Sequence, residues 1–593
     1  MNWIDTRTRL NQRLEDLRRE REGFLGVWRE LSDYVQPYRG RFLGRNDRPN
    51  SGLFNDEHII DNKATRAIRV LAAGMQSGLT SPGQPWFKLT TQDPGLIEFG
   101  PVHTWLSDVE AIFRDIFGRS NIYNALHGVY TELGLFGTAG MIVSADHENV
   151  IRARPLTAGE AMFDQGPRLH VDTLFRESKM TVRQLVEQFG IKNVGSVVRD
   201  AYDKGDYGRW FDVVHAIEPN DDVKPNRKDA AGKKWQEIYY EVGGSSDKPL
   251  AISGYEEFPA MVPRWDIVGV DVYGRSPAME TLADIKMLQT LQTRSLQVID
   301  KNTNPPLTAP ATMKGQVINA LPGGVNFINA AHGNQSIQPV YQPTIGIRDL
   351  ESKIERVQES ISEGFYADVF MMLTKGGKGQ MTATEVAERH EEKLVMIGPV
   401  LERLQHELLD PLIDRTFAIA QRAGMLPPIP EELKGTSLKV DYISPLAQAQ
   451  KMVGIGSIKL FTDQVTRIAK LDQSVMDRID LDQVVPIIAD AMGVPSRLIR
   501  SESDVEKRRK EMKKAQEAPP PGGAMPQVAG GAPPVDPSAM LGALGGMGGA
   551  MPQGLNIDPA ALSQIAGQMG TAVSSSPALS NIVSSLLGGG AQQ

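Results

Sequence analysis

The spacing of apolar residues changes twice along this 593-residue chain, and each spacing permits one kind of secondary structure. Up to residue 135 apolar residues recur mostly at helical spacing. Between about 141 and 264, short β-branched or aromatic runs alternate with turn residues, which is typical of an antiparallel meander, and a helix at 181–189 interrupts it. From 276 the helical spacing returns. The sequence therefore predicts a helix-rich α+β fold.

Composition excludes several functional classes. The chain has no cysteine, which removes disulfide scaffolds, thiolate metal sites and cysteine nucleophiles. Its formal charge of -8 does not favour the broad basic surface of tight nucleic-acid binders, so any DNA partner would be held loosely. No stretch has the roughly 18 uncharged apolar residues of a membrane span, and the N-terminus lacks a signal-peptide core. We expect a soluble protein made in a reducing cytoplasm, with no membrane partner.

A helical stalk is predicted in the second half of the chain. An apolar stripe runs from Ser276 to about Asp300, a helix of about 37 Å at 1.5 Å per residue, and a second helix spans about 348–364. The segment 302–346 between them is rich in Pro, Gly and Asn, so the two helices should pair antiparallel with a small module at the tip. The stripe consists of Met279, Leu282, Ile285, Leu288 and Leu291.

A glycine-rich segment and a long helix follow the stalk. The segment cannot hold regular structure because three of its six residues are glycines. The helix begins at Thr382 or Thr384 and ends near Gly424, and Pro399 and Pro411 inside it predict kinks or short breaks. The residues of the segment are Lys375, Gly376, Gly377, Lys378, Gly379 and Gln380.

The C-terminal part divides into a helical unit and a low-complexity tail. A smaller helical unit is expected over about 444–515. Beyond Glu517 the only charged residues are Asp536 and Asp558, and such a tail buries too little apolar surface to offset its ordering entropy, so we expect it to be mostly disordered. The last helix of the unit carries the densest basic cluster of the chain: Lys507, Arg508, Arg509, Lys510, Lys513 and Lys514.

No motif predicts an enzyme, a cofactor or a metal. A phosphate loop needs Gly-Lys-Ser/Thr entering a helix, whereas Lys378 is followed by Gly379. The aspartates at 477, 480 and 482 lack the turn glycine and closing glutamate of a calcium loop. We find no His-Glu-x-x-His and no Gly-x-Ser-x-Gly. From periodicity and motifs alone, the chain is a multidomain, helix-rich structural protein.

Six segments resemble a known family, the portal proteins or head-to-tail connectors of short-tailed, double-stranded DNA phages. Among them are YVQPYRGRFL and FRESKMTVRQLVEQFG. Together they extend from residue 34 to about 420 in the order expected for the family. The segments are 34–43, 59–89, 104–143, 175–190, 273–310 and 381–417.

The resemblance implies a division of the chain that follows the order of the predicted elements. A wing of helices and antiparallel strands would precede two stem helices that flank a clip, and a tunnel loop would precede a long helix, a crown and the tail. The implied ranges are 1–272 for the wing, 273–301 for the first stem helix, 302–346 for the clip, 347–367 for the second stem helix, 368–381 for the tunnel loop, 382–439 for the long wing helix, 440–516 for the crown and 517–593 for the tail.

The resemblance also implies a function. Such portals form twelve-subunit rings at one capsid vertex of the virion, with capsid, scaffolding, terminase large-subunit and tail adaptor proteins as partners. Double-stranded DNA passes through their channel during packaging, retention and ejection, and the portal is not the ATPase. Two alternatives remain open from the residues alone: a nucleotide-driven packaging motor using the glycine-rich segment, and a structural adaptor of the virion without a channel.

The same resemblance gives the two basic segments a meaning. Lys375 and Lys378 would form flexible lysine rings near the DNA, in a channel whose walls are otherwise weakly charged or repulsive, so that DNA slides without being captured. The alternative is that these lysines only keep an exposed loop solvated. The cluster at 507–514 would either contact packaged DNA or be an exposed helix end.

Overall fold

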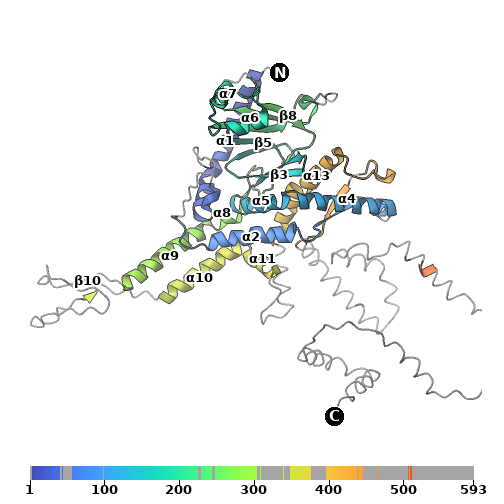
Figure 1. The fold of residues 1–593 in the computed structure, drawn as a ribbon. Coiled ribbons are helices and arrows are strands. Elements are labelled where there is room, and N and C mark those ends of the chain that lie inside the picture. Colours follow the sequence, from blue (N-terminus) through green and yellow to red (C-terminus); the bar gives the residue numbers. More distant parts are fainter. Residues whose placement is uncertain are drawn as a thin grey trace, which may run out of the picture. The chain divides into compact units, whose positions relative to one another are not determined.

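The computed structural model of the chain is drawn in Figure 1. Two compact units divide the chain, Met1–Val505 and Glu506–Gln593, and everything below except one helical turn belongs to the first. Mixed helix and sheet make up this first unit, as the sequence predicts. The structure describes residues 3–40, 43, 57–97, 99–224, 227, 229–242, 248–303, 307–308, 338–339, 347–374, 396–436, 438–444, 446, 465, 505 and 508–510.

The N-terminal helices form where the sequence predicts them. The first helix stops before Pro37, which instead opens a short 3-10 turn. Two of the helices, α2 and α5, pack on each other through Ile68, Leu71 and Leu133, all fully buried. The elements are α1 Trp3–Tyr34, η1 Pro37–Arg39, α2 Lys63–Leu79, α3 Pro94–Ile97, α4 Gly100–Arg119 and α5 Ile122–Phe136.

Residues 161–255 of the predicted meander form a five-stranded antiparallel sheet in the order β4-β5-β6-β7-β8, whereas its two ends, at 140–156 and 260–261, belong to a separate three-stranded sheet, so the prediction of a single meander was wrong there. Since alternate residues of a strand face opposite sides, the sheet has two apolar faces. Helix α1 covers one face with Leu10 and Leu14, and α6 and α7 cover part of the other around Val213. The elements are β4 Ala161–Gln165, β5 Val171–Thr181, α6 Val182–Phe189, α7 Ser196–Asp203, β6 Trp210–Pro219, η2 Ala230–Gly232, β7 Trp235–Glu241 and β8 Ala251–Tyr255.

Smaller sheets include one strand pair that the sequence did not predict. Strand β1, Phe87–Thr91, pairs antiparallel with β12, Leu438–Tyr442, across about half of the chain. The long helix ends at Arg422, close to the end near Gly424 that the spacing predicts. Strand β12 lies across position 440, where the resemblance implies the start of the crown. Strands β2 Gly140–Asp146, β3 Val150–Leu156 and β9 Ala260–Met261 form another sheet in the order β3-β2-β9.

The second half contains the two paired helices and the long helix. The first begins as a short turn, α8 Pro277–Glu280, and continues as α9 Leu282–Thr303, and the second is α10 Ile347–Gly364. Between them the described residues include the strand pair β10 Leu307–Thr308 and β11 Gln338–Pro339. Helix α11 Ala367–Thr374 follows α10, so the expected loop at 368–381 was wrong over its first seven residues, which are helical.

The long helix is irregular before Pro411, as predicted, but it is unbroken through Pro399, where a break was also expected. Residues 396–404 are α-helical, Gln405–Leu409 form a π-helical turn, and α13 continues over Asp410–Arg422 before the 3-10 turn η6, Glu431–Leu433. Pro411 lacks the N–H that an α-helical hydrogen bond requires, and the π turn stands directly before it. The predicted start of this helix, at 382 or 384, lies outside the described residues.

One hydrophobic core joins these parts. It contains Trp28 of α1, Leu71 of α2, Leu288 of α9, Ile361 of α10 and Leu412 of α13, which are buried in a single cluster. The paired helices therefore share a core at their base with the N-terminal helices and the long helix.

Candidate functional site: a helical hairpin and the joint at its base

Helices α9 and α10 pack side by side as an antiparallel hairpin (Figure 1). Ser360 Oγ donates to Asp284 at 2.7 Å, which places the end of α10 beside the start of α9. Of the predicted stripe, two residues are fully buried and three are partly buried against the same core, and α10 contributes Ile354, Val357 and Ile361. The buried pair is Ile285 and Leu288, and the partly buried residues are Met279, Leu282 and Leu291.

The start of the hairpin is held by a close approach of two glycines. Gly137 ends α5 with φ +78°, a conformation that favours glycine, and a Cβ there would lie 2.4 Å from the Gly274 carbonyl oxygen. Thr138 Oγ1 accepts the Gly274 N–H at 2.7 Å. Ser276 Oγ donates to the Leu135 carbonyl at 2.8 Å and accepts the Met279 N–H at 3.0 Å, so it caps the hairpin while it binds α5.

A second contact, which we name the Asp61 clasp, ties the hairpin to the start of α2. The clasp consists of Asp61, Gln289, Gln292 and Gln358. Gln289 Oε1 accepts the N–H groups of Ile60 and Asp61, each at 2.8 Å, and its Nε2 donates to the Asp61 carbonyl at 2.8 Å. The Asp61 carboxylate accepts Nε2 of Gln292 at 2.9 Å and of Gln358 at 2.8 Å. One carboxylate thus binds both helices of the hairpin.

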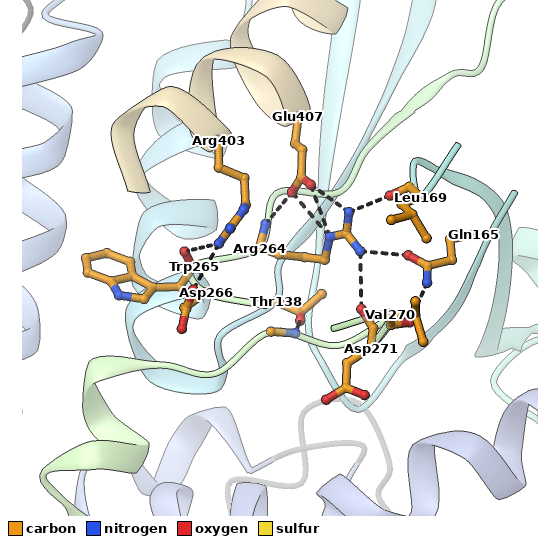
Figure 2. Close-up of polar contacts among 11 residues, drawn as sticks. Thr138, Gln165, Leu169, Arg264, Trp265, Asp266, Val270, Asp271, Arg403 and Glu407 are labelled. Carbon is orange, nitrogen blue, oxygen red and sulfur yellow. Dashed lines mark hydrogen bonds and ion pairs between the residues drawn. The ribbon is translucent and has the colours of Figure 1, made fainter. Parts of the chain in front are cut away.

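A third contact, which we name the joint, lies between the sheet region and the long helix (Figure 2). Its residues are Arg264, Glu407, Gln165, Leu169 and Asp271. Arg264 is only 2% exposed. Its side-chain Nη2 donates to Glu407 Oε1 at 2.6 Å, and its backbone N–H donates to Glu407 Oε2 at 2.9 Å. The rest of the guanidinium donates to Gln165 Oε1 at 3.0 Å, to the Leu169 carbonyl at 2.8 Å and to the Asp271 carbonyl at 3.4 Å.

The long helix supplies two further anchors near the joint. Arg403, about one turn before Glu407, donates to the Trp265 carbonyl at 2.9 Å (Figure 2). Farther along, the buried Arg415 donates to Glu257 at 2.7 Å, and Arg422 donates to both oxygens of the same carboxylate. Burial acts to raise the pKa of Glu257, but these two guanidinium groups outweigh it and lower the pKa.

The contacts of the clasp and the joint fix the orientation of the helices. The charges of the joint are neutralised by bidentate contacts, which fix orientation because the guanidinium fork accepts a carboxylate in few geometries. Within the described ranges no group of three or more His, Asp or Glu side chains could hold a metal ion. The described helices likewise include none that is long and apolar enough to cross a membrane.

Of the basic segments predicted from the sequence, the structure describes little. Lys375 to Gln380 lie outside the described residues, as do Lys507, Lys513 and Lys514. Arg508, Arg509 and Lys510 form an exposed helical turn in the second unit. The helix that leads to the glycine-rich segment is anchored, because Phe370 of α11 packs on Gly74 of α2, where a Cβ would lie 2.2 Å from the ring.

The joint and the Asp61 clasp were missed by sequence reasoning. Each joins residues more than 90 positions apart, so no local spacing signals them. The one available signal was Arg264 itself, a charged residue at the end of the otherwise apolar run from Phe258 to Trp265 that has no charged neighbour within it. A charge in such a run requires a partner if the run is buried.

Comparison with known sequences identifies the family. The family model described as bacteriophage head to tail connecting protein matches residues 7–499, and so includes the hairpin, the clasp and the joint. The chain belongs to this family of phage head-to-tail connectors. The "Probable portal protein" of Bordetella phage BPP-1 is 43% identical over 509 residues, which are 86% of this chain and 91% of the relative. The "Portal protein" of Salmonella phage epsilon15 is 39% identical over 515 residues, 86% and 92% of the two chains.

Two solved particle structures contain chains that are similar to this connector at low identity. A chain from the virion of a native gene transfer agent particle has a TM-score of 0.29 with 12% identity, and covers 69% of this chain and 86% of its own. A chain from the neck of an empty gene transfer agent particle has a TM-score of 0.31 with 12% identity, and covers 69% and 91%.

Proposed function

We propose that copies of this connector close into a ring, with twelve subunits as the family resemblance implies, around an axial channel for double-stranded DNA at one capsid vertex. The observation that carries the proposal is the match to the connector family from residue 7 to residue 499. Both curated relatives bear the name portal protein and align over most of their length. In this role the chain packages, retains and releases the genome as part of the virion, without catalysis of its own.

In this proposal the hairpin is the stem, and the remaining elements take the places that the resemblance implies. The wing would comprise 1–272, the clip would lie between α9 and α10, and the tunnel loop would begin after Thr374, where α11 ends. The crown would follow β12, after Tyr442. Terminase, tail adaptor, capsid and scaffolding proteins would contact the ring, as the family resemblance implies.

The distal half of α9 supports a ring of identical subunits. Leu296 is 56% exposed and Ile299 43% exposed in the single chain, although both are large apolar residues on the helix proposed as the stem. A closed ring needs head-to-tail contacts between copies of one chain, and neighbouring stem helices would cover these side chains.

The charge of the chain supports passage of DNA rather than tight binding. Each copy carries a formal charge of -8, so a ring repels the phosphate backbone on average. Lys375 and Lys378 of the proposed tunnel loop would lie near the DNA, and the cluster at 507–514 would lie where packaged DNA meets the crown. Weak contacts of this kind let DNA slide through the channel.

Particle mass and negative-stain images of the purified full-length chain test the proposal. We expect an annular particle with a central hole and a mass of about twelve subunits. A stable monomer at all concentrations, with or without capsid components, would refute the ring. ATP hydrolysis that Lys378→Ala abolishes would instead establish the packaging-motor alternative, and an assembly without a hole would establish the adaptor alternative.

A further inference from the structure

A pocket of about 450 Å³ opens on the face of the five-stranded sheet that α6 partly covers. The residues that line it come from four elements. Arg154 lies on β3, Arg176 and Lys179 lie on β5, Gln184 lies on α6, and Tyr239 lies on β7. Arg154 and Arg176 present two guanidinium groups to the pocket, which suits it to an anion. The Lys179 side chain, three positions after Arg176 on β5, lies on the opposite face of the sheet beside Asp212.

Arg176 is built into the floor of the sheet. The strand register places Arg176, His215 and Tyr239 opposite one another, so their side chains share one face in a single row across three strands. The ring of His215 stacks on that of Tyr239 with centroids 4.0 Å apart. Arg176 is only 8% exposed, and its position is therefore determined by the packing of the row.

The guanidinium of Arg176 has unused hydrogen-bond capacity. Glu160 Oε1 lies 2.7 Å from its Nε, which makes an ion pair. Nη1, in contrast, is buried and meets no acceptor among the described residues. A buried donor without an acceptor is costly, and a ligand with a suitably placed oxygen would remove that cost.

The local charge also favours an anion. Arg154 is exposed and makes no ion pair with any residue that the structure describes. Burial lowers the pKa of Arg176, and the nearby charge of Arg154 lowers it further, while Glu160 opposes the effect. Burial also lowers the pKa of His215, so the imidazole adds no charge at neutral pH. Arg154 and Arg176 both lie near Glu160, and Glu187, the other carboxylate at the pocket, is paired with Arg183.

Gln184 offers a fixed donor at the same pocket. In the capping box of α6, its Oε1 accepts the Thr181 N–H at 2.9 Å, and its own N–H donates to Thr181 Oγ1 at 3.3 Å. The side-chain oxygen is thus occupied, and the amide Nε2, which can only donate, is the group that Gln184 presents to a ligand.

We propose that this pocket binds a single carboxylate, the Asp or Glu side chain of an acidic segment on a partner protein. A guanidinium matches a carboxylate with two parallel hydrogen bonds, and Tyr239 and Met180 provide apolar wall for the methylene groups of the acidic side chain. Duplex DNA fits poorly, because Arg176 is only 8% exposed at the floor of the pocket, where the phosphates of a rigid duplex do not reach it. The proposal is independent of ring formation.

Binding of a labelled oligoglutamate peptide to the purified full-length chain tests the pocket, with oligoglutamine, inorganic phosphate and a short DNA duplex as parallel probes. We expect oligoglutamate to bind, and Arg176→Met and Arg154→Gln each to weaken binding about tenfold or more, as loss of a charged hydrogen bond predicts. Arg152→Gln is the matched control, since Arg152 lies on the same strand as Arg154 but does not line the pocket, and should change binding by less than about twofold.

Several outcomes would overturn the proposal. They are absence of oligoglutamate binding, equal binding of oligoglutamine, an equal loss in Arg152→Gln, and binding confined to phosphate or to the duplex. If Arg176→Met does not fold, Arg154→Gln decides, because the Arg154 side chain is exposed. Images of the same samples show whether rings form, so failure of the pocket and failure of the ring are distinguished.

Discussion

Replacement of Arg264 by methionine is the sharpest test of the joint. Methionine fills part of the volume of the arginine side chain but removes the charge and all side-chain donors. Glu407, whose side chain is 11% exposed, would keep only the Arg264 backbone N–H as a partner. Gln165 Oε1 and the carbonyl oxygens of Leu169 and Asp271 would also lose the guanidinium.

The expected cost is large because one partner of a buried pair remains. Breaking such a pair by removing one side costs about 3–5 kcal/mol, most of which is the penalty of the uncompensated buried charge. At about 1.4 kcal/mol per factor of ten, local opening around the joint should become about a hundred to a few thousand times more frequent. Removing both charges with Arg264→Met and Glu407→Leu together should restore much of the loss.

Native-state hydrogen exchange followed by mass spectrometry measures this opening directly, and it suits a chain too large for two-state unfolding. The informative amides are those of Trp265, which donates to the Gly137 carbonyl, and Arg275, which donates to the Asp266 carbonyl. Arg403→Met is the matched control, since Arg403 also contacts this segment but is partly exposed, and should cost less than about 1 kcal/mol. Equal exchange in Arg264→Met and Arg403→Met would refute the reasoning.

Three further perturbations test the hairpin, the glycine-rich segment and the sheet. Leu288→Asp should prevent folding or ring assembly, because it places an unpaired charge at a fully buried position. Leu282→Asp should have a smaller effect on assembly, because Leu282 is only partly buried. A normal particle mass for Leu288→Asp would contradict this prediction. Deletion of Gly376–Gly379 should leave rings intact but reduce the DNA retained per particle, and unchanged DNA content would remove the segment from the mechanism. Burial lowers the pKa of His215 in the folded chain, although the imidazole is hydrogen-bonded to Glu237. In the unfolded chain the histidine has its ordinary pKa of 6.5, so as the pH falls below 6.5 the unfolded chain binds a proton before the folded chain does, and the free energy of unfolding decreases. His215→Gln should flatten the decline of Tm with falling pH, and an unchanged slope would exclude this histidine as its source.

The elements that sequence predicts well are those whose signal is local. The stripe around Ile285 and Leu288 repeats at helical spacing, and the capping box at Thr181 starts α6 where the residues indicate. The pairing of β1 with β12 has no such signal, because each is a five-residue strand whose partner is more than 300 positions away. Prolines at 427 and 428 predict where the long helix stops, but not that the chain then returns as a strand.

The candidate sites built on buried charges lack a local signal in the sequence. A buried charge depends on its partner rather than on its neighbours in sequence, so the sequence around Arg176 and Arg264 does not show which of them has a complete set of acceptors. Arg264 has an acceptor for every nitrogen of its guanidinium, whereas Nη1 of Arg176 is a buried donor without one among the described residues. The first is therefore complete within the chain and serves to orient the long helix against the sheet. The hydrogen bonds of Arg176 are complete only when a ligand supplies an acceptor. We therefore assign a structural role to Arg264 and a binding role to Arg176.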